Sequence, residues 1–321
     1  MNIALITGMA GQDGSYLAEQ LLGQGYSVLG GVRNIAKAEA SLPLKLRESV
    51  ELISWDMGDL SAMKEVIAST RPSEIYNFAA CSSGAGMFDD PLGMADLNGV
   101  AVTRILEAVR AVNPKIRFCQ ASSREIFGEA LKSPQTESTP PNPRSPYGAA
   151  KLYADCMIRI YRRRYGLHAC SAILFNHESP RRGLEFVTHK ITHEAARIKL
   201  GLAHELQLGN LETQRDWGYA GDYVRAMWLM LQRDTADDYV VATGEAHTVR
   251  EFCEVAFEHL GLVYRDHVRE DTASYRPSEP VPLVGSPDKA RRELGWEPKV
   301  GFRELVHMMV DADMRSLSLT I

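Results

Sequence analysis

The first half of the chain alternates short apolar runs with longer stretches in which apolar residues recur every three or four positions. The short runs are typical of buried strands, and the longer stretches are typical of amphipathic helices. Strands are expected within residues 2–8, 26–33, 50–56, 74–80, 116–122 and 168–175. Helices are expected within residues 14–25, 60–69, 99–112 and 145–166. Because strands alternate with helices, the pattern predicts a parallel sheet that helices cover on both faces.

The pattern changes after residue 175. Helical periodicity continues at residues 186–201 and 220–232, and a Pro-rich stretch then precedes a last helical pattern at residues 286–296. A short apolar run at residues 239–242 is a candidate to return to the sheet. The texture of this part predicts a smaller lobe that lies against the sheet.

The fold class that we expect is α/β, with a Rossmann-type doubly wound parallel sheet and a smaller C-terminal α/β lobe that binds substrate. Residues 1–175 are expected to form the dinucleotide-binding domain, with returning elements from residues 208–245. Residues 176–321 then form most of the lobe. In α/β enzymes the cleft between such parts usually holds the substrate.

Composition narrows the function classes. The chain is 45% hydrophobic and 24% charged, as in ordinary soluble globular proteins. Its net charge of −5 gives no electrostatic reason to expect nucleic acid or an anionic membrane as a partner. The five cysteines are scattered without a CxxC pair, so we expect reduced thiols in a cytoplasmic protein and no metal site. Since no stretch approaches 18 consecutive apolar residues, we expect no membrane span.

Three glycines, Gly8, Gly11 and Gly14, lie between the first predicted strand and the first predicted helix. Glycine permits the tight turn and lets backbone N–H groups approach a pyrophosphate at the positive end of the helix. The alternative is an ordinary Gly-rich turn, but the strand before it and the helix after it favour dinucleotide binding. We include Gln12 and Asp13 of the same turn among the cofactor-binding residues.

The ends of the next strands carry further candidate cofactor contacts. Arg33 follows the second strand, where a cation favours a ribose 2′-phosphate and therefore NADP over NAD, although a solvated surface Arg is the alternative. Asp56 and Met57 end the third strand pattern and can flank the adenine, although Asp56 can equally cap a helix. Ala79, at the end of the fourth, completes this set.

The stretch YGAAK places Tyr147 and Lys151 at i and i+4, on one face of a helix. A nearby ammonium favours the phenolate and lowers the pKa of the tyrosine. Such a tyrosine can take the proton of a sugar hydroxyl while hydride leaves the same carbon for a nicotinamide. An exposed helix pair is the alternative, but Ser123 and the glycine turn favour catalysis. We expect His168 and His177 to be structural.

Eight segments, which together extend over most of the chain, carry a more specific signature. They are GQDGSYLAEQLL, RSPYGAAKLYA, ILFNHESPRRG, FVTHKI, LGNLETQRDWG, DYVRAMWLMLQ, ATGEAHTVREF and YRPSE. Together they resemble the GDP-mannose 4,6-dehydratase family of extended short-chain dehydrogenases/reductases. This resemblance implies a homodimer or homotetramer that removes water from a GDP-linked manno-configured sugar, with NADP as cofactor, and leaves a 4-keto-6-deoxy product.

The resemblance also implies a role for each catalytic residue. Tyr147 is the base for O4 of the sugar, Lys151 orients the nicotinamide ribose and tunes Tyr147, and Ser123 bonds O4 where the family usually has Thr. Glu125 falls on the family's catalytic Glu. After hydride leaves C4, Glu125 takes the acidic C5 proton while water departs from C6, and the hydride then returns to C6.

Substrate contacts of the family map onto residues in both halves of the chain. They are Ser83, Asn176, Glu178, Arg181, Val187, Lys190, Gly209, Arg215, Arg276 and Glu279. Arg and Lys suit a diphosphate, and a carboxylate suits guanine or a ribose diol. A salt bridge or a solvated surface charge is the alternative for each charged residue.

The chain departs from the family at positions near the sugar and near the cofactor. Cys81 and Ser83 replace Gln and His, which leaves a smaller and less polar wall. The larger GDP-D-glycero-D-manno-heptose, with an extra carbon on C6, is therefore an alternative substrate. Asn34 replaces one of two paired arginines after the second strand. Arg124 replaces a small Ser beside Glu125, where it either reshapes the sugar end or faces solvent.

Two other functions are weighed against dehydration. A nucleotide-sugar 4-reductase or 4-epimerase needs Ser123, Tyr147 and Lys151 but no carboxylate at Glu125, so Glu125 argues against it. A non-catalytic nucleotide-sugar or NADP-binding protein has no need of a tuned phenol, so the intact Ser–Tyr–Lys set argues against that function.

Overall fold

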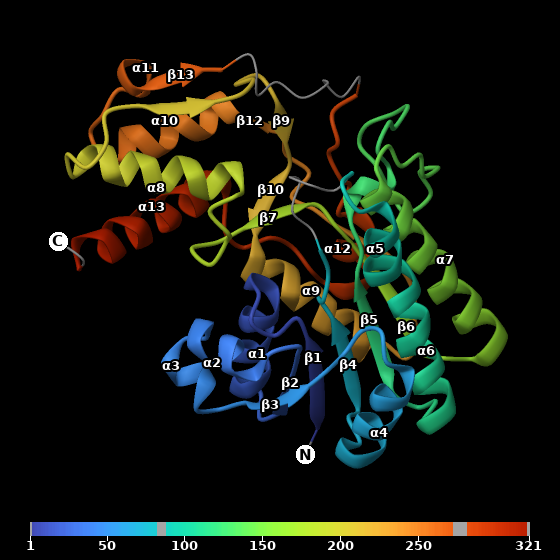
Figure 1. Cartoon of the computed structure of the whole chain (residues 1–321). Helices are drawn as coiled ribbons and strands as arrows, with labels where there is room; N and C mark the ends of the chain where they lie inside the picture. The colour runs from blue at the N-terminus through green and yellow to red at the C-terminus, as the bar shows by residue number, and fades with distance from the viewer. Residues whose placement is uncertain (1, 82–87, 272–280, 320–321) are drawn as a thin grey trace.

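The centre of the molecule is a seven-stranded sheet in which every neighbouring pair of strands is parallel (Figure 1). The computed structural model describes residues 2–81, 88–271 and 281–319. The strands are β1 (Ile3–Thr7), β2 (Ser27–Val32), β3 (Glu51–Ser54), β4 (Glu74–Asn77), β5 (Arg117–Ala121), β6 (Ala169–Leu174) and β11 (Tyr239–Val241). Their order is β11-β6-β5-β4-β1-β2-β3. All the predicted strands are confirmed, and the run at residues 239–242 does return to the sheet as β11.

Helices cover both faces of this sheet, as the alternation of strands and helices predicted (Figure 1). On one face lie α1 (Gln12–Gly23), α9 (Ala220–Gln232) and α12 (Asp288–Leu294). On the other lie α4 (Leu60–Thr70), α6 (Ala101–Val112) and α7 (Pro146–Tyr165). Along β1, Ala4 and Ile6 pack on the first face and Leu5 on the second, because successive side chains of a strand point in opposite directions.

Short elements connect these layers. They are α2 (Ile35–Ser41), α3 (Leu44–Arg47), α5 (Pro91–Ala95), the π-helical turn η1 (Asp96–Val100) and the 3₁₀ turn η2 (Arg124–Ile126). Asp59 is the residue that caps α4, through hydrogen bonds from the N–H groups of Ser61 and Ala62. The alternative role of Asp56 as a helix cap is therefore wrong, because its side chain accepts from Gly58 within a turn instead.

The C-terminal lobe has its own apolar core, which includes Trp217, Phe252 and Phe257. Around it pack α8 (Val187–Lys199), α10 (Val249–His259) and α13 (Phe302–Ser318), with the short α11 (Tyr264–His267). Three small two-stranded sheets complete the lobe: β7 (Asn176–Glu178) with β10 (Trp217–Tyr219), β8 (Leu206–Leu208) with β13 (Val268–Glu270), and β9 (Gln214–Arg215) with β12 (His247–Thr248). We did not predict α10 or α13.

The fold directs the predicted chemistry to one edge of the sheet. The strand order reverses between β1 and β4, and a crevice forms at the carboxyl ends of strands where such a reversal occurs.

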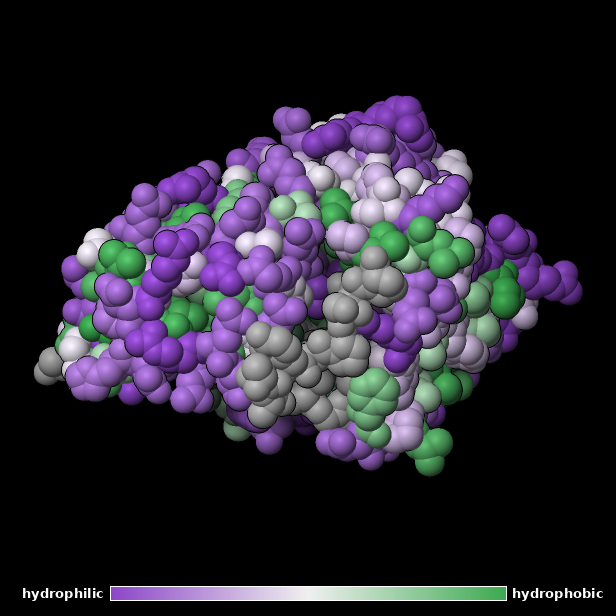
Figure 2. Space-filling view, turned by 90° about the horizontal axis from the view of Figure 1, so that it is seen from above, coloured by the Kyte–Doolittle hydropathy of each residue, from purple (hydrophilic) through white to green (hydrophobic). Residues whose placement is uncertain are grey.

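Figure 2 looks onto the molecule from above, where hydrophilic residues predominate. All five cysteines are free thiols. Within the described residues, no helix combines the length and the apolar character that a membrane crossing requires.

Candidate active site

The turn after β1 is shaped so that backbone alone approaches its centre. Gly8 has φ +69°, and a Cβ there would lie 2.8 Å from the backbone N of Ala79. A Cβ on Gly14 would lie 2.7 Å from the carbonyl O of Gly8. Gly11 is the residue before α1, and no side chain caps the first N–H groups of that helix. The turn therefore offers backbone donors at a positive helix end, and it fits a pyrophosphate.

The two polar residues of this turn connect α1 to the lobe. Gln12 accepts a hydrogen bond from the hydroxyl of Ser179 (2.8 Å) and donates to the carbonyl of His177 (3.1 Å). Asp13 Oδ2 lies 2.9 Å from His177 Nε2, while His177 Nδ1 donates to the carbonyl of Phe175 (2.7 Å). Burial opposes both charges, but the attraction between them prevails, so the pKa of Asp13 is lowered and that of His177 is raised.

We expected His177 to be structural, and its contact with Asp13 joins β7 to the glycine turn. It is held from β7, stacks on Tyr223 at 4.8 Å, and orients Asp13 in the first turn of α1. The signal that pointed to it was its place in NHESPRRG, the segment directly after β6.

The remaining cofactor candidates lie at carboxyl ends of neighbouring strands. Arg33 is exposed directly after β2. Ala79 follows β4 and touches the glycine turn, and its N–H donates to Thr7 Oγ1 (3.2 Å). Asp56 is exposed. Met57 is instead buried, with its sulfur 3.1 Å from Trp55 Nε1, so most of its apolar surface already packs inside the protein.

The start of α7 presents Tyr147 and Lys151 toward the end of β5. Ser145 caps the helix by accepting from Gly148 N–H, and Pro146 occupies the first turn. A side chain at Gly148 would collide with the carbonyl O of Glu125, so glycine permits this close approach. Lys151 Nζ lies 5.6 Å from the centre of the Tyr147 ring and donates to the carbonyl of Ala121 (2.8 Å). The predicted pair is thus confirmed as one face of a helix.

Ser123 and Glu125 lie in the same corner, on the turn that follows β5. Ser123 Oγ accepts from Glu125 N–H (3.2 Å) and also hydrogen-bonds to the phenol of Tyr147. Glu125 Oε1 lies 2.8 Å from Arg124 Nη2, in an ion pair whose carboxylate side chain is 20% exposed. Since Arg124 is buried, the alternative that it faces solvent is wrong. Its guanidinium is the ion-pair partner of the Glu125 carboxylate.

Burial dominates the electrostatics of α7. It raises the pKa of Tyr147 to about 12, since the hydrogen bond from Ser123 lowers it less and the Glu125 charge raises it further. Burial also lowers the pKa of Lys151 to about 8, against the attraction of Asp155. The expected lowering of the Tyr147 pKa is therefore wrong for the chain alone, because removal of water disfavours the phenolate more than its neighbours stabilise it.

One further residue of α7 belongs to this face and was not predicted. Asp155, one turn after Lys151, is fully buried and accepts hydrogen bonds from Ser122 (2.7 Å) and Ser171 (2.6 Å). Burial raises its pKa to about 6, although both hydroxyls lower it. Its i+4 spacing from Lys151 was visible in the sequence.

The predicted substrate residues on β7 and the loop after it already have protein partners. Glu178 is buried, accepts from the hydroxyl of Thr188 (2.7 Å) and pairs with Arg182 Nε (3.1 Å). Arg181 lies against α1, with Nη2 2.6 Å from Glu19 Oε1. Asn176 Oδ1 differs, since it is buried and has no hydrogen-bond partner among the described residues.

The other substrate residues spread along the lobe. Val187 begins α8 and is exposed, and Lys190 Nζ donates to the carbonyl of Gln207 in β8 (2.7 Å). Gly209 follows β8, and Arg215 lies in β9, where its guanidinium donates to the carbonyl of Gln214. Ser83, Arg276 and Glu279 lie outside the described residues.

A glycine turn at the point where strand order reverses, together with Ser123 after β5 and with Tyr147 and Lys151 on α7, defines a short-chain dehydrogenase/reductase. The appended lobe places it with the extended members of that class. The family model described as GDP-mannose 4,6 dehydratase matches residues 5–309. The chain belongs to the GDP-mannose 4,6-dehydratase family.

Full-length relatives support this assignment. GDP-mannose 4,6 dehydratase 1 of Arabidopsis thaliana is 48% identical over 324 residues, covering 97% of this chain and 90% of that protein. GDP-mannose 4,6 dehydratase of Homo sapiens is 45% identical, covering 98% of this chain and 91% of that protein. A relative from Yersinia enterocolitica with the same name is 41% identical, covering 98% and 94%.

Solved structures confirm the fold. UDP-glucose 4-epimerase of Thermotoga maritima, solved with UDP-glucose, superposes with a TM-score of 0.86 at 25% identity, covering 98% of this chain and 99% of that one. UDP-glucose 4-epimerase of Thermus thermophilus, in complex with NAD, gives a TM-score of 0.82 at 28% identity, covering 97% and 98%. dTDP-glucose 4,6-dehydratase of Bacillus anthracis, with NAD, gives 0.84 at 22% identity, covering 99% and 98%.

Proposed function

We propose that the chain is a GDP-mannose 4,6-dehydratase, a hydro-lyase that converts GDP-mannose into its 4-keto-6-deoxy derivative and water. The observation that carries the proposal is the position of Glu125, whose carboxylate lies on the turn that also presents Ser123 toward Tyr147. A reductase or an epimerase uses the Ser–Tyr–Lys set alone. Elimination of water needs an additional group to move the C5 proton, and we assign that role to Glu125.

A nicotinamide dinucleotide supplies the acceptor for the C4 hydride and, once reduced, the donor that returns it to C6. Tyr147 removes the proton from O4 as the C4–H bond breaks, and Ser123 holds O4 through its hydroxyl. Glu125 takes the proton from C5 and passes it to the C6 hydroxyl, which leaves as water. C5 then regains one proton, which balances the proton that Tyr147 took from O4. The redox changes cancel, so one water is lost and no cofactor is consumed.

NADP is the form of the cofactor that we propose. Its pyrophosphate fits the cradle of Gly8, Gly11 and Gly14, with Gln12, Asp13 and Ala79 around it. Arg33 is exposed at the end of β2, where its charge suits a ribose 2′-phosphate. An Arg33→Ala variant should weaken binding of NADP and leave binding of NAD unchanged, which titration of the two cofactors against tryptophan fluorescence would measure.

The sugar nucleotide is proposed to bind between the two parts of the chain. Residues 1–175, with elements from 208–245, hold the cofactor, and residues 176–321 supply most of the GDP contacts. Asn176 supports this division, since its buried Oδ1 lacks a partner among the described residues at the entrance to the lobe. We also propose a cytoplasmic homodimer or homotetramer, which sedimentation of the purified chain would distinguish.

The deciding experiment follows one hydrogen atom. GDP-mannose that carries deuterium at C4 is incubated with the purified chain and NADP⁺, and the product is examined by mass spectrometry and NMR. We expect loss of one water, deuterium at C6, and no accumulation of NADPH. Recovery of unchanged GDP-mannose, or a C4 epimer without loss of water, would overturn the proposal. A parallel incubation with GDP-manno-heptose measures which sugar has the higher kcat/KM.

The role of Glu125 has its own variant. Glu125→Gln should reduce dehydration about 10³-fold while cofactor binding is retained, because only the group that moves the C5 proton is lost. Glu129→Gln is the matched control, since Glu129 is exposed four residues later on the same loop. Full dehydration by Glu125→Gln would contradict the assigned role.

A further inference from the structure

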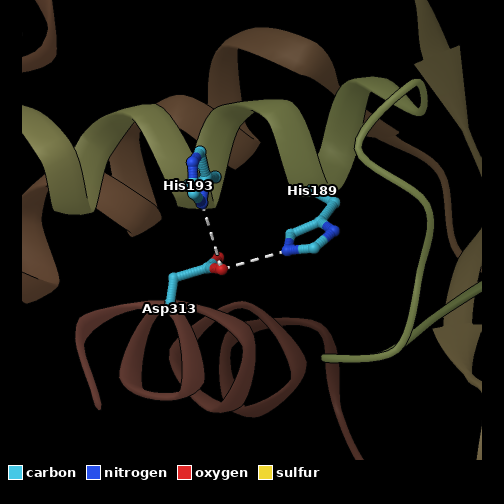
Figure 3. A group of neighbouring side chains, drawn as sticks. All are labelled: His189, His193 and Asp313. Atoms are coloured by element: carbon cyan, nitrogen blue, oxygen red, sulfur yellow. Dashed lines mark hydrogen bonds and ion pairs between the residues drawn. The ribbon is translucent and has the colours of Figure 1, made fainter. Parts of the chain in front are cut away.

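Two histidines and an aspartate meet between α8 and α13, and none of the three is among the predicted site residues (Figure 3). His189 and His193 are spaced i and i+4, so both rings leave the same face of α8 toward Asp313 on α13. His189 Nε2 lies 3.0 Å and His193 Nδ1 lies 3.6 Å from Asp313 Oδ1. One donor atom of each residue lies within 4.8 Å of the other two.

These separations are those of ligands around a small divalent cation. Zn²⁺ bonds to imidazole nitrogen and carboxylate oxygen are about 2.0–2.1 Å long, which places the ligand atoms of a tetrahedral site about 3.3 Å apart. The two distances to Asp313 lie on either side of that value. The longer of the two distances involves His193, whose side chain is 26% exposed and has room to turn.

The orientation of His189 is already that of a metal ligand. Its Nδ1 donates to the carbonyl of Arg182 (2.6 Å), and this bond leaves Nε2 directed at Asp313. Metal-binding histidines commonly make this second bond, because it fixes the ring and raises the basicity of the ligating nitrogen.

An ion pair with His189 accounts for only one of the two carboxylate oxygens of Asp313. His189 Nε2 lies 3.0 Å from this oxygen, Oδ1 of Asp313. The residue is only 7% exposed, and its other oxygen, Oδ2, is buried without a hydrogen-bond partner among the described residues. A buried carboxylate oxygen without a partner costs free energy, and a cation between the three side chains would remove that cost.

We propose that His189, His193 and Asp313 form a Zn²⁺ site that joins α8 to α13. Two imidazoles and one carboxylate suit Zn²⁺, whereas Mg²⁺ and Ca²⁺ prefer oxygen ligands alone. Water completes the coordination from the open side of His193. The role is structural: α8 carries Val187 and Lys190 at its start, and the ion fixes that helix against the last helix of the chain.

The test measures the metal directly. The purified full-length chain is stripped with a chelator, dialysed, and titrated with Zn²⁺ in competition with a chromogenic chelator. We expect one Zn²⁺ per chain, an intense visible absorption when Co²⁺ replaces it, and no competition from a large excess of Mg²⁺. His193→Gln and Asp313→Asn should each weaken Zn²⁺ binding at least about 100-fold.

The control separates this site from a surface histidine. His259 Nε2 pairs with Asp311 Oδ1 at 2.7 Å on the exposed side of α13, so His259→Gln removes a comparable pair and should leave Zn²⁺ affinity unchanged. Zn²⁺ should also raise the Tm of the wild-type chain by several degrees and leave that of His193→Gln unchanged. Absence of stoichiometric binding, or equal binding by wild type and His193→Gln, would overturn the proposal.

Discussion

The two sides of the candidate active site are built differently. On the side of α7, Tyr147, Lys151 and Asp155 are buried and held by regular packing against β5 and β6. On the side of the lobe, Arg181 and Lys190 lie nearer the surface, and each already binds a group of the protein. In the proposed function, the side of α7 is preorganised before substrate binds, whereas Arg181 and Lys190 would have to leave their present partners to contact GDP.

The largest effect should come from the preorganised side. Tyr147→Phe removes the proton acceptor of a buried site in which water cannot replace it, so dehydration of GDP-mannose should fall about 10³-fold or more. Cofactor affinity and the free energy of unfolding should change little, because the ring remains in place. Product formation in single-turnover reactions is the measurement.

Tyr153→Phe is the control for this variant. Tyr153 lies on the same helix but is 42% exposed, and its phenol makes only a 3.4 Å contact to Thr103. It should keep wild-type activity. A Tyr147→Phe enzyme that retains a tenth of its activity would mean that α7 does not supply the base.

The next largest effect, on stability, is expected when the pair of His177 and Asp13 that joins the two sides is broken. His177→Gln breaks the partly buried pair with Asp13 and leaves that carboxylate without its cation, so the free energy of unfolding at pH 6 should fall by about 3 kcal/mol. Urea unfolding gives this value. His204→Gln, an exposed histidine, should change it by less than about 0.5 kcal/mol.

The pH dependence of this pair follows from its two shifted pKa values. The pKa of His177 is raised above 6.5, so its contribution is complete below pH 6.5 and is lost as pH rises through the raised value. The pKa of Asp13 is lowered below 3.8, so its contribution is present above pH 3.8 and is lost as pH falls through the lowered value. Stability curves of wild type and His177→Gln should therefore converge at alkaline pH, and parallel curves would exclude the pair as their cause.

A smaller effect is expected when Lys151 loses the nearby charge of Asp155. The pKa of Lys151 is about 8, so activity that needs its ammonium is present below that pH and is lost as pH rises through it. Asp155→Asn keeps a side chain of the same shape but removes the charge that raises the pKa of Lys151. The alkaline limb of kcat/KM should then move to lower pH by roughly one unit. An unmoved limb would assign that limb to another group.

Features that depend on residues close together in the chain could be predicted from the sequence, and contacts between distant residues could not. Strands, the glycine turn and the pair on α7 followed from local periodicity, because each depends on residues that are close in the chain. The contact between His177 and Asp13 was not predicted, because the two residues lie 164 positions apart and no local pattern reports such a contact. Asp155 and the helix α10 were missed despite local signals, the latter despite a capping box of Thr248 and Glu251.

The smallest effect should come from the lobe and test its exchangeable charges. Arg181 Nη2 binds Glu19 at 2.6 Å near the surface, so Arg181→Gln should lower the free energy of unfolding by less than about 1 kcal/mol. If the guanidinium turns from Glu19 to the diphosphate, KM for GDP-mannose should rise about three- to fivefold at unchanged kcat. Glu19→Gln releases the same guanidinium and should leave KM equal or lower. Steady-state kinetics of both variants measures these KM values. If neither change moves KM, Arg181 is only a link between α1 and the lobe. Lys190 and Arg215 would then be the remaining candidates for the diphosphate.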